Sequence, residues 1–159
     1  MKILTSFSEL NTLNKDIVFA LGTFDGIHVG HQTVIRKAVE EAKAKDAYAI
    51  VVTFDKHPLH IINPEKEPKA LLQQPSKAVV FESLLVDYVL MLPMSKELIK
   101  MSAQDFVCNL TDSGRVVGLV MGENFTFGAG GKGNPDVLKD LVKKSKSPLV
   151  KVHELQLAH

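Results

Sequence analysis

The sequence predicts an α/β domain with an open, mostly parallel sheet and helices on both of its faces. Short, continuous apolar runs alternate along the chain with segments whose apolar residues recur at helical spacing. This alternation is typical of parallel sheets, whose strands are buried on both faces by the connecting helices. At 159 residues and 45% apolar composition, the chain has the size of one domain.

The first strand–helix–strand unit is predicted between residues 17 and 53. Ile17–Leu21 and Tyr48–Thr53 are apolar runs of strand length, and Gly22 follows the first of them directly. Between the two runs, Val29–Ala44 carries apolar residues every three or four positions with charged residues between them. This is the period of an amphipathic helix.

The same alternation continues to the end of the chain. We expect further strands at Tyr88–Leu92, Val116–Met121 and Leu149–Leu155, and further helices at Pro75–Leu85, Ser102–Leu110 and from Asn134 to about Lys144. Ser102 and Asn134 are typical N-cap residues, and Pro75 and Pro135 suit a first helical turn. The stretch from His57 to Pro75 is predicted to be a long loop.

Composition excludes several classes of protein. The net charge is +1, and the only cluster of cations, Lys143, Lys144 and Lys146, is explained by the end of a helix, so no nucleic-acid partner is expected. Cys108 is the single cysteine, which rules out an intrachain disulfide. There is no secretory signal pattern and no apolar run of about 20 residues. We therefore expect a cytoplasmic protein without membrane contact.

Chemistry is concentrated between the first predicted strand and the first predicted helix, in residues 22–31. In a doubly wound sheet this is the carboxyl edge, where ligands bind. Glycines there allow a ligand close to the backbone, and the helix start at Gly30 offers N–H groups to a phosphate. His28 and His31 are three residues apart and can face one phosphate, an arrangement that suits phosphoryl or nucleotidyl transfer.

Other interpretations of this segment stay open. It is neither a P-loop, because no lysine follows the glycines, nor a GxGxxG dinucleotide motif. His28 and His31 could bind zinc if His57 or His60 and a carboxylate completed the site. Alternatively, the glycines only form a turn and the histidines only cap a helix.

Three ordered segments resemble one family. Residues 22–31 (GTFDGIHVGH) are similar to the GxFDGxHxGH signature of bacterial-type FAD synthetases, a branch of the HxGH nucleotidyltransferases. Residues 53–58 (TFDKHP) resemble the TFxPHP segment of that family, with Lys56 in place of a proline. Residues 122–128 (GENFTFG) resemble its G-(E/D)-(D/N)-F-x-F-G segment.

The resemblance implies an FMN adenylyltransferase, which transfers AMP from ATP to FMN with Mg²⁺ bound through the ATP phosphates and no metal ligand from the protein. His28 and His31 are the catalytic candidates. The expected ATP-binding residues are Gly22, Thr23, Phe24, Asp25, Gly26, His28, Gly30 and His31. The expected FMN-binding residues are His57, Pro58, Asn124, Phe125 and Phe127. The alternatives are another HxGH adenylyl- or cytidylyltransferase and a non-catalytic module that binds a nucleotide or a flavin.

Two further expectations concern the loop after the fourth strand and the end of the chain. Gly128, Gly130, Gly131 and Gly133 predict a mobile loop, in which at least one of Phe125 and Phe127 is a core residue. Residues 1–159 correspond to the adenylyltransferase domain, whereas the family's Ser-Ser-Thr-x-Ile-Arg segment and riboflavin kinase domain are absent. We therefore expect a fragment that folds but catalyses poorly, since Arg36 and Arg115 are not placed to replace the missing arginine.

Overall fold

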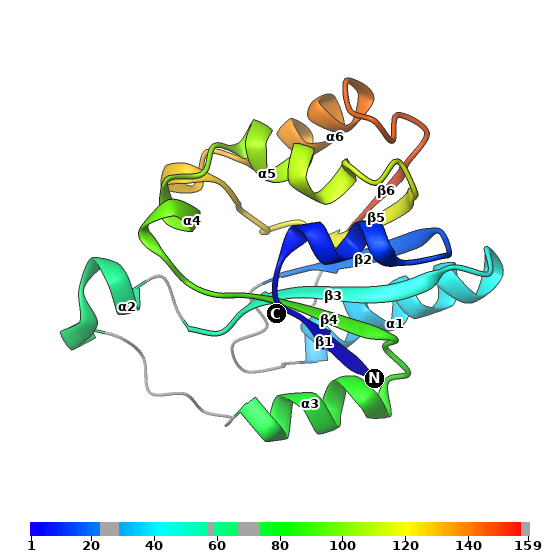
Figure 1. The fold of residues 1–159 in the computed structure, drawn as a ribbon, viewed down its shortest axis with the longest axis horizontal. Coiled ribbons are helices and arrows are strands. Elements are labelled where there is room, and N and C mark those ends of the chain that lie inside the picture. The colour runs from blue at the N-terminus through cyan, green and yellow to red at the C-terminus, as the bar shows by residue number, and fades with distance from the viewer. Residues whose placement is uncertain (23–28, 57–58, 67–73, 157–159) are drawn as a thin grey trace.

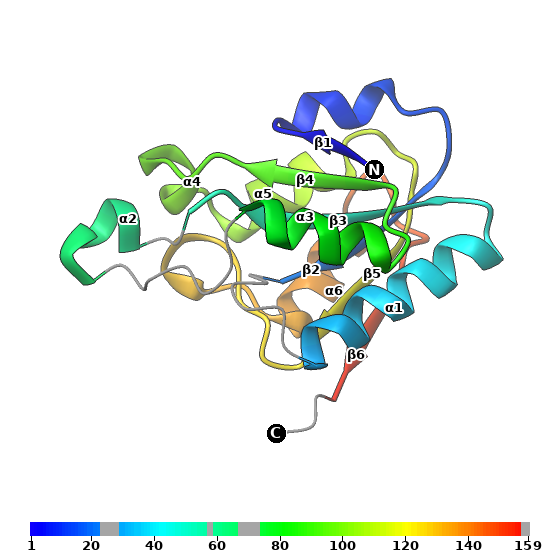
Figure 2. The ribbon, with the colours of Figure 1, turned by 90° about the horizontal axis from the view of Figure 1, so that it is seen from below.

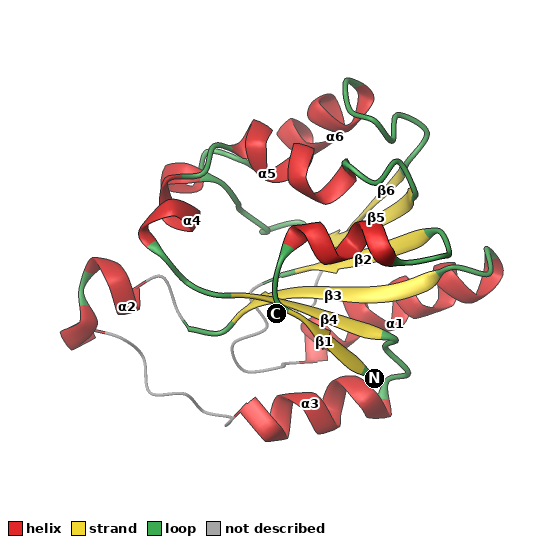
Figure 3. Ribbon diagram, viewed as in Figure 1, coloured by secondary structure: helices red, strands yellow, loops and turns green. Residues whose placement is uncertain are grey.

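The computed structural model describes residues 1–22, 29–56, 59–66 and 74–156. Its centre is a sheet of six strands in the order β1-β4-β3-β2-β5-β6, and every pairing between neighbouring strands is parallel (Figure 1). Helices lie on both faces of the sheet, as Figure 3 shows. The predicted fold class is therefore confirmed.

The strands are β1 (Lys2–Leu4), β2 (Ile17–Leu21), β3 (Tyr48–Phe54), β4 (Tyr88–Leu92), β5 (Val116–Gly122) and β6 (Lys151–Leu155). The α-helices are α1 (Val29–Ala44), α2 (Leu59–Ile62), α3 (Gln74–Ser83), α4 (Lys96–Lys100), α5 (Ala103–Thr111) and α6 (Pro135–Lys143). Three 3₁₀ turns, η1 (Phe7–Thr12), η2 (Pro64–Lys66) and η3 (Ala129–Gly131), complete the described elements.

Alternate residues of the strands build two separate cores. On one face, Phe19, Ile50 and Leu119 pack with the apolar residues of η1, α5 and α6. On the other, Val18 and Val51 pack with the apolar residues of α1 and α3, and these two helices lie together on that face in Figure 2. Because successive residues of a strand point to opposite faces, a continuous apolar run is what a strand covered on both sides requires.

Most predicted elements are present, some with identical bounds, as for β2, β4 and α1. The caps are confirmed: Ser102 Oγ accepts from Asp105 N–H at 3.0 Å, and Asn134 Oδ1 accepts from Val137 N–H at 2.9 Å. The helix predicted to end at Leu85 ends at Ser83. The residues after it form a helix C-cap, in which Val86 N–H donates to Phe81 C=O at 3.2 Å.

The loop predicted from His57 to Pro75 is partly wrong, because α2 and η2 lie within it. Residues 57–58 and 67–73 of this stretch are outside the described residues. Besides α2 and η2, four further described elements were not predicted: β1, η1, α4 and η3. These are short, and short segments are stabilised by tertiary packing more than by their own periodicity.

The strand order places a topological switch point beside β2. The chain leaves β2 through α1 to β3 on one side, whereas β5 lies on the other side of β2. In open α/β sheets, ligands bind in the crevice outside the carboxyl ends of the strands at such a point. Within the described residues, no helix is long and apolar enough to cross a membrane.

Candidate active site

An apolar pocket of about 360 Å³ opens at the carboxyl edge of the sheet. Leu21 and Gly22, at the end of β2, form one side, together with Val52 and Phe54 of β3. The segment after β5 forms the opposite side, through residues 125–128 and Gly130 and Gly131. The pocket therefore lies across the switch point, and its volume is in the range of small-molecule sites.

Two phenylalanine rings stack in the wall of this pocket. The centroids of Phe125 and Phe127 are 5.6 Å apart, and the planes differ by 13°. Phe127 is buried, with 7% of its surface exposed, and its ring also contacts Phe106 of α5 at 5.6 Å. The expectation that one of these two phenylalanines is a core residue is confirmed for Phe127, which nevertheless lines the pocket.

The glycine-rich loop next to these rings is tightly bound to its neighbours. Phe127 and Gly133 exchange backbone hydrogen bonds of 3.2 and 2.8 Å, and Ala129 N–H donates to Met101 C=O at 2.8 Å. A Cβ on Gly128 would lie 2.7 Å from the backbone nitrogen of Ala103. Close approach of neighbouring atoms explains Gly128 and Gly133, and a positive φ of 66° explains Gly130 and Gly131. The mobility predicted for this loop stays a prediction.

A third side of the pocket was not found from the sequence. Met94 follows β4, Leu98 and Ile99 belong to α4, and Met101 and Phe106 belong to the segment that follows. Ser95 caps α4, because its Oγ accepts from Leu98 N–H at 3.1 Å. The sequence does carry one sign of their role: these residues come after a predicted parallel strand, and the end of that strand must lie at the carboxyl edge of the sheet.

The amino end of α1 meets the same edge of the sheet. Val29 is the first residue of this helix and directly follows residues 23–28, which lie outside the described residues; His31 lies in the first turn and is half-buried. Free N–H groups of a first helical turn favour a bound anion. His28, Thr23, Phe24, Asp25 and Gly26 lie outside the described residues, so their predicted roles remain predictions.

The structure brings together only some of the residues that were predicted to bind the second substrate. Phe125 and Phe127 line the pocket with Gly22, which was assigned to the ATP side. Asn124 is exposed in the turn that follows β5 and is not among the pocket-lining residues. His57 and Pro58 lie outside the described residues.

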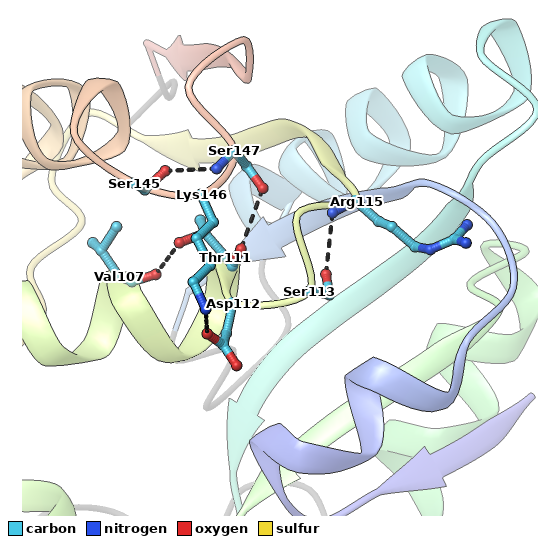
Figure 4. Close-up of polar contacts among 8 residues, drawn as sticks. All are labelled: Val107, Thr111, Asp112, Ser113, Arg115, Ser145, Lys146 and Ser147. Atoms are coloured by element: carbon cyan, nitrogen blue, oxygen red, sulfur yellow. Dashed lines mark hydrogen bonds and ion pairs between the residues drawn. The ribbon is translucent and has the colours of Figure 1, made fainter.

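A group of polar contacts lies at the opposite, amino edge of the sheet (Figure 4). Lys146 Nζ donates to Asp112 Oδ1 at 2.8 Å, which raises the pKa of Lys146, and buried Ser147 donates to the carbonyl of Thr111 at 3.3 Å. Arg115 immediately precedes β5 and its N–H donates to Ser113 Oγ at 3.2 Å. Lys146 and Arg115 are therefore at the wrong end of the sheet to reach a ligand in the pocket.

A second charged cluster lies where β6 packs against α1. His153 Nε2 is buried 3.6 Å from Glu41 Oε2 and forms no hydrogen bond there. Burial lowers the pKa of His153, and it outweighs the opposing effect of Glu41. Lys37 donates to Glu41 at 3.2 Å and holds the pKa of that carboxyl below its usual range. Neutral His153 is therefore the form that the fold favours.

Metal binding by the protein has no support among the residues described. No three His, Cys, Asp or Glu side chains of that part of the chain are grouped to hold an ion. The zinc interpretation also involves His28 and His57, which lie outside it, and so it is not tested.

Comparisons with known proteins agree with the motifs. The sequence profile of the FAD synthetase family matches residues 10–159. A bifunctional riboflavin kinase/FMN adenylyltransferase of Listeria monocytogenes is 35% identical over 136 residues, which are 85% of this chain and 42% of that protein. The protein of the same description from Buchnera aphidicola (subsp. Schizaphis graminum) is 24% identical over 98% of this chain and 50% of its own length. The chain thus spans about half the length of the curated relatives it matches.

The fold is also known from a solved structure. A crystal structure described as a macrolide-efflux protein from Streptococcus pneumoniae superposes with a TM-score of 0.79 over 98% of this chain and 58% of that one. At 22% identity this likeness concerns the fold alone. The match of the family profile to nearly the whole chain establishes that this protein belongs to the FAD synthetase family.

Proposed function

We propose that this protein is an FMN adenylyltransferase, which transfers AMP from ATP to FMN and releases FAD and pyrophosphate. The observation that carries the proposal is the apolar pocket at the switch point, lined by Phe125 and Phe127 and adjacent to the amino end of α1. The family match supports the same reaction class. The proposal concerns the activity of the whole protein. The relatives are about twice as long as this chain.

The pocket suits a flat aromatic ring such as isoalloxazine. Its lining is almost entirely apolar, and Phe125, whose ring stacks on that of Phe127, is an aromatic part of its wall. Offset stacking on such a wall favours aromatic ligands beyond the gain from burying their surface. A charged or strongly polar group in the same space would lose its hydration without gaining hydrogen-bond partners.

The phosphates would lie toward α1. Backbone N–H groups of its first turn and the positive end of its dipole favour negative charge, and His31 lies in that turn. Gly22 lies in the pocket lining directly after β2 and leaves room for a ligand at the boundary between the two substrates. Thr23, Phe24, Asp25 and Gly26 would complete the adenosine side.

The chemistry requires positioning and charge stabilisation more than proton transfer. An oxygen of the FMN phosphate, ionised at neutral pH, forms a bond to the α-phosphorus of ATP, and the bond from that phosphorus to the bridging oxygen of the β-phosphate breaks. The electron pair leaves with pyrophosphate. His28 and His31 would donate hydrogen bonds to the oxygens on which charge accumulates.

Magnesium would arrive as part of the nucleotide substrate, bound through the ATP phosphates. Its role would be to neutralise charge on the leaving group.

Flavin titration tests the proposal. Calorimetry measures the affinity for FMN, and Phe125→Ala should weaken FMN binding by about 10-fold, because the variant lacks the aromatic ring on which the flavin would stack. The matched control is Phe7→Ala, which removes an aromatic ring that packs edge-on against Phe106 at 6.0 Å but does not line the pocket. Equal FMN affinity in the parent and the Phe125 variant would contradict the placement of the flavin.

A further inference from the structure

Two aspartates form hydrogen bonds across the same pair of strands, β3 and β4, one at each end of the pair. Asp87 precedes β4, its N–H donates to Ala49 C=O at 3.0 Å, and its Oδ2 accepts from Ala49 N–H at 2.9 Å. Asp55 follows β3, its N–H donates to Leu92 C=O at 3.2 Å, and its Oδ1 accepts from Met94 N–H at 2.8 Å. Each carboxylate thus adds one hydrogen bond to the ladder between β3 and β4.

The bond from Asp55 replaces one that the backbone cannot make. Leu92 is the last residue of β4, and Pro93 after it has no N–H to continue the ladder. Met94 carries the next N–H, in a partly buried position where an unpaired donor would be unfavourable. The carboxylate of Asp55 accepts from it and fixes the direction in which the chain leaves β4.

That direction determines one side of the pocket. Met94 lines the pocket, the next residue, Ser95, caps α4, and Leu98 and Ile99 of α4 line the pocket as well. We propose that Asp55 is a positioning residue for the flavin: by holding the Met94 N–H, it places the side of the pocket formed by Met94 and α4 against the ring. This inference rests on the proposed function.

Asp87 provides a matched control within the same two strands. Its bond to Ala49 has nearly the same length and the same chemistry. Asp87 lies at the opposite end of the five-residue strand β4 from Met94, about 16 Å away along the strand at ~3.3 Å per residue. Asp55→Ala and Asp87→Ala should lower the melting temperature by similar amounts, whereas only Asp55→Ala should alter flavin binding.

The experiment measures the dissociation constants of FMN, of lumiflavin as a probe of the ring alone, and of ATP. For Asp55→Ala we expect FMN and lumiflavin to bind about 10-fold more weakly, with ATP affinity within about 2-fold of the parent. Asp55→Asn keeps an oxygen acceptor and should restore flavin affinity to within about 3-fold of the parent. Asp55→Glu, which keeps the charge but displaces the oxygen, provides a second perturbing variant if the alanine variant does not fold.

The outcomes separate the two proposals. If the parent binds FMN and both Asp55→Ala and Asp55→Glu bind it equally well, the inference is wrong and the proposed function stands. The inference is also wrong if Asp87→Ala weakens flavin binding as much as Asp55→Ala, since that would be a general effect of strand stability. If the parent binds neither FMN nor lumiflavin, the proposed function fails and the inference fails with it.

Discussion

Phe127 and Gly133 close the glycine-rich loop at the pocket by reciprocal backbone hydrogen bonds of 3.2 and 2.8 Å. Gly133 also lies against the aromatic ring, since a Cβ on it would come within 2.7 Å of Cε1, Cζ and the carbonyl oxygen of Phe127. The pair fixes the ring that stacks on Phe125. A glycine six residues from the aromatic side chain thus helps to determine the shape of the pocket.

Gly133→Ala should displace the Phe127 ring and weaken FMN binding, with a loss of about 1–3 kcal/mol in the free energy of unfolding, because the clash includes backbone. Gly114→Ala is the control, because Gly114 does not line the pocket. At Gly114 a Cβ would meet only the carbonyl oxygen of Lys146 at 3.7 Å, an ordinary contact, and only the positive φ of 72° opposes the substitution, at about 1 kcal/mol. Equal flavin affinity in both variants would show that the contact between Gly133 and Phe127 has no part in binding.

His31→Ala, and equally His28→Ala, should lower the rate of AMP transfer by about 100-fold and leave the melting temperature nearly unchanged. An imidazole at the start of a helix can stabilise the negative charge that develops on the phosphate oxygens in the transition state. Loss of one such donor commonly raises the activation free energy by about 3 kcal/mol. Rate and thermal unfolding must be measured on the same preparations. Variants that melt far below the parent, but are fully active in their folded fraction, would assign these histidines a structural role.

Leu85→Gly should raise the free energy of unfolding by about 1 kcal/mol. Leu85 has φ of 68° in the C-cap that follows α3, a conformation that favours glycine, and it is 59% exposed, so little buried surface would be lost. The control is Ser83→Gly, in the last turn of α3, which should be destabilising by up to about 1 kcal/mol. Chemical denaturation measures both, and a destabilised Leu85→Gly variant would contradict the interpretation of this cap.

Acid should destabilise the parent through His153. Its pKa is lowered in the folded state by burial, so the unfolded state binds the proton more strongly. The stabilising contribution is complete above the unfolded pKa of about 6.5 and is lost as the pH falls from there through the folded pKa. Glu41 faces the imidazole and opposes this loss, whereas Lys37, Lys45 and Lys151 reinforce it.

His153→Leu should abolish this part of the pH dependence. The stability of the parent relative to the variant should decrease between about pH 7 and 5, with a slope of at most about 1.4 kcal/mol per pH unit for one proton. Glu41 contributes in a separate, more acidic range, because its pKa is lowered. A parent that gains stability relative to the variant on acidification would mean that a charged pair with Glu41 prevails over burial.

The sequence predicted those parts of the fold whose signals are local and repeated. Val29–Ala44 has four turns of helical periodicity, and Ile17–Leu21 is apolar at every position, so the bounds of both elements were identified. By contrast, β1 has only three residues and exists because it pairs with β4 at the edge of the sheet. Ser6 and Glu9 have the spacing of a capping box, and Glu9 Oε1 accepts from Ser6 N–H at 3.2 Å, but the six residues of η1 are too few for a helical period to identify the element.

The candidate site was predictable where residue type and strand end coincide. Gly22 directly follows β2, Phe125 and Phe127 lie in the segment after β5, and the structure brings all three into one pocket. Met94 and Leu98 could not be told from ordinary core residues, because an apolar side chain carries no sign of whether its partner is protein or ligand. The role of Asp55 depends on a tertiary hydrogen bond to Met94, 39 positions away, which no local pattern reveals.

The most direct test of the proposed function is a competition among acceptors. The purified protein would be supplied with Mg²⁺, ATP labelled at the α-phosphate, and equal concentrations of FMN, nicotinamide mononucleotide and phosphopantetheine, and the labelled products would be separated. We predict that FAD takes up nearly all of the transferred label and that pyrophosphate is released in equal amount. Efficient labelling of nicotinamide mononucleotide or phosphopantetheine, with FMN unreacted, would contradict the assignment of the pocket to a flavin.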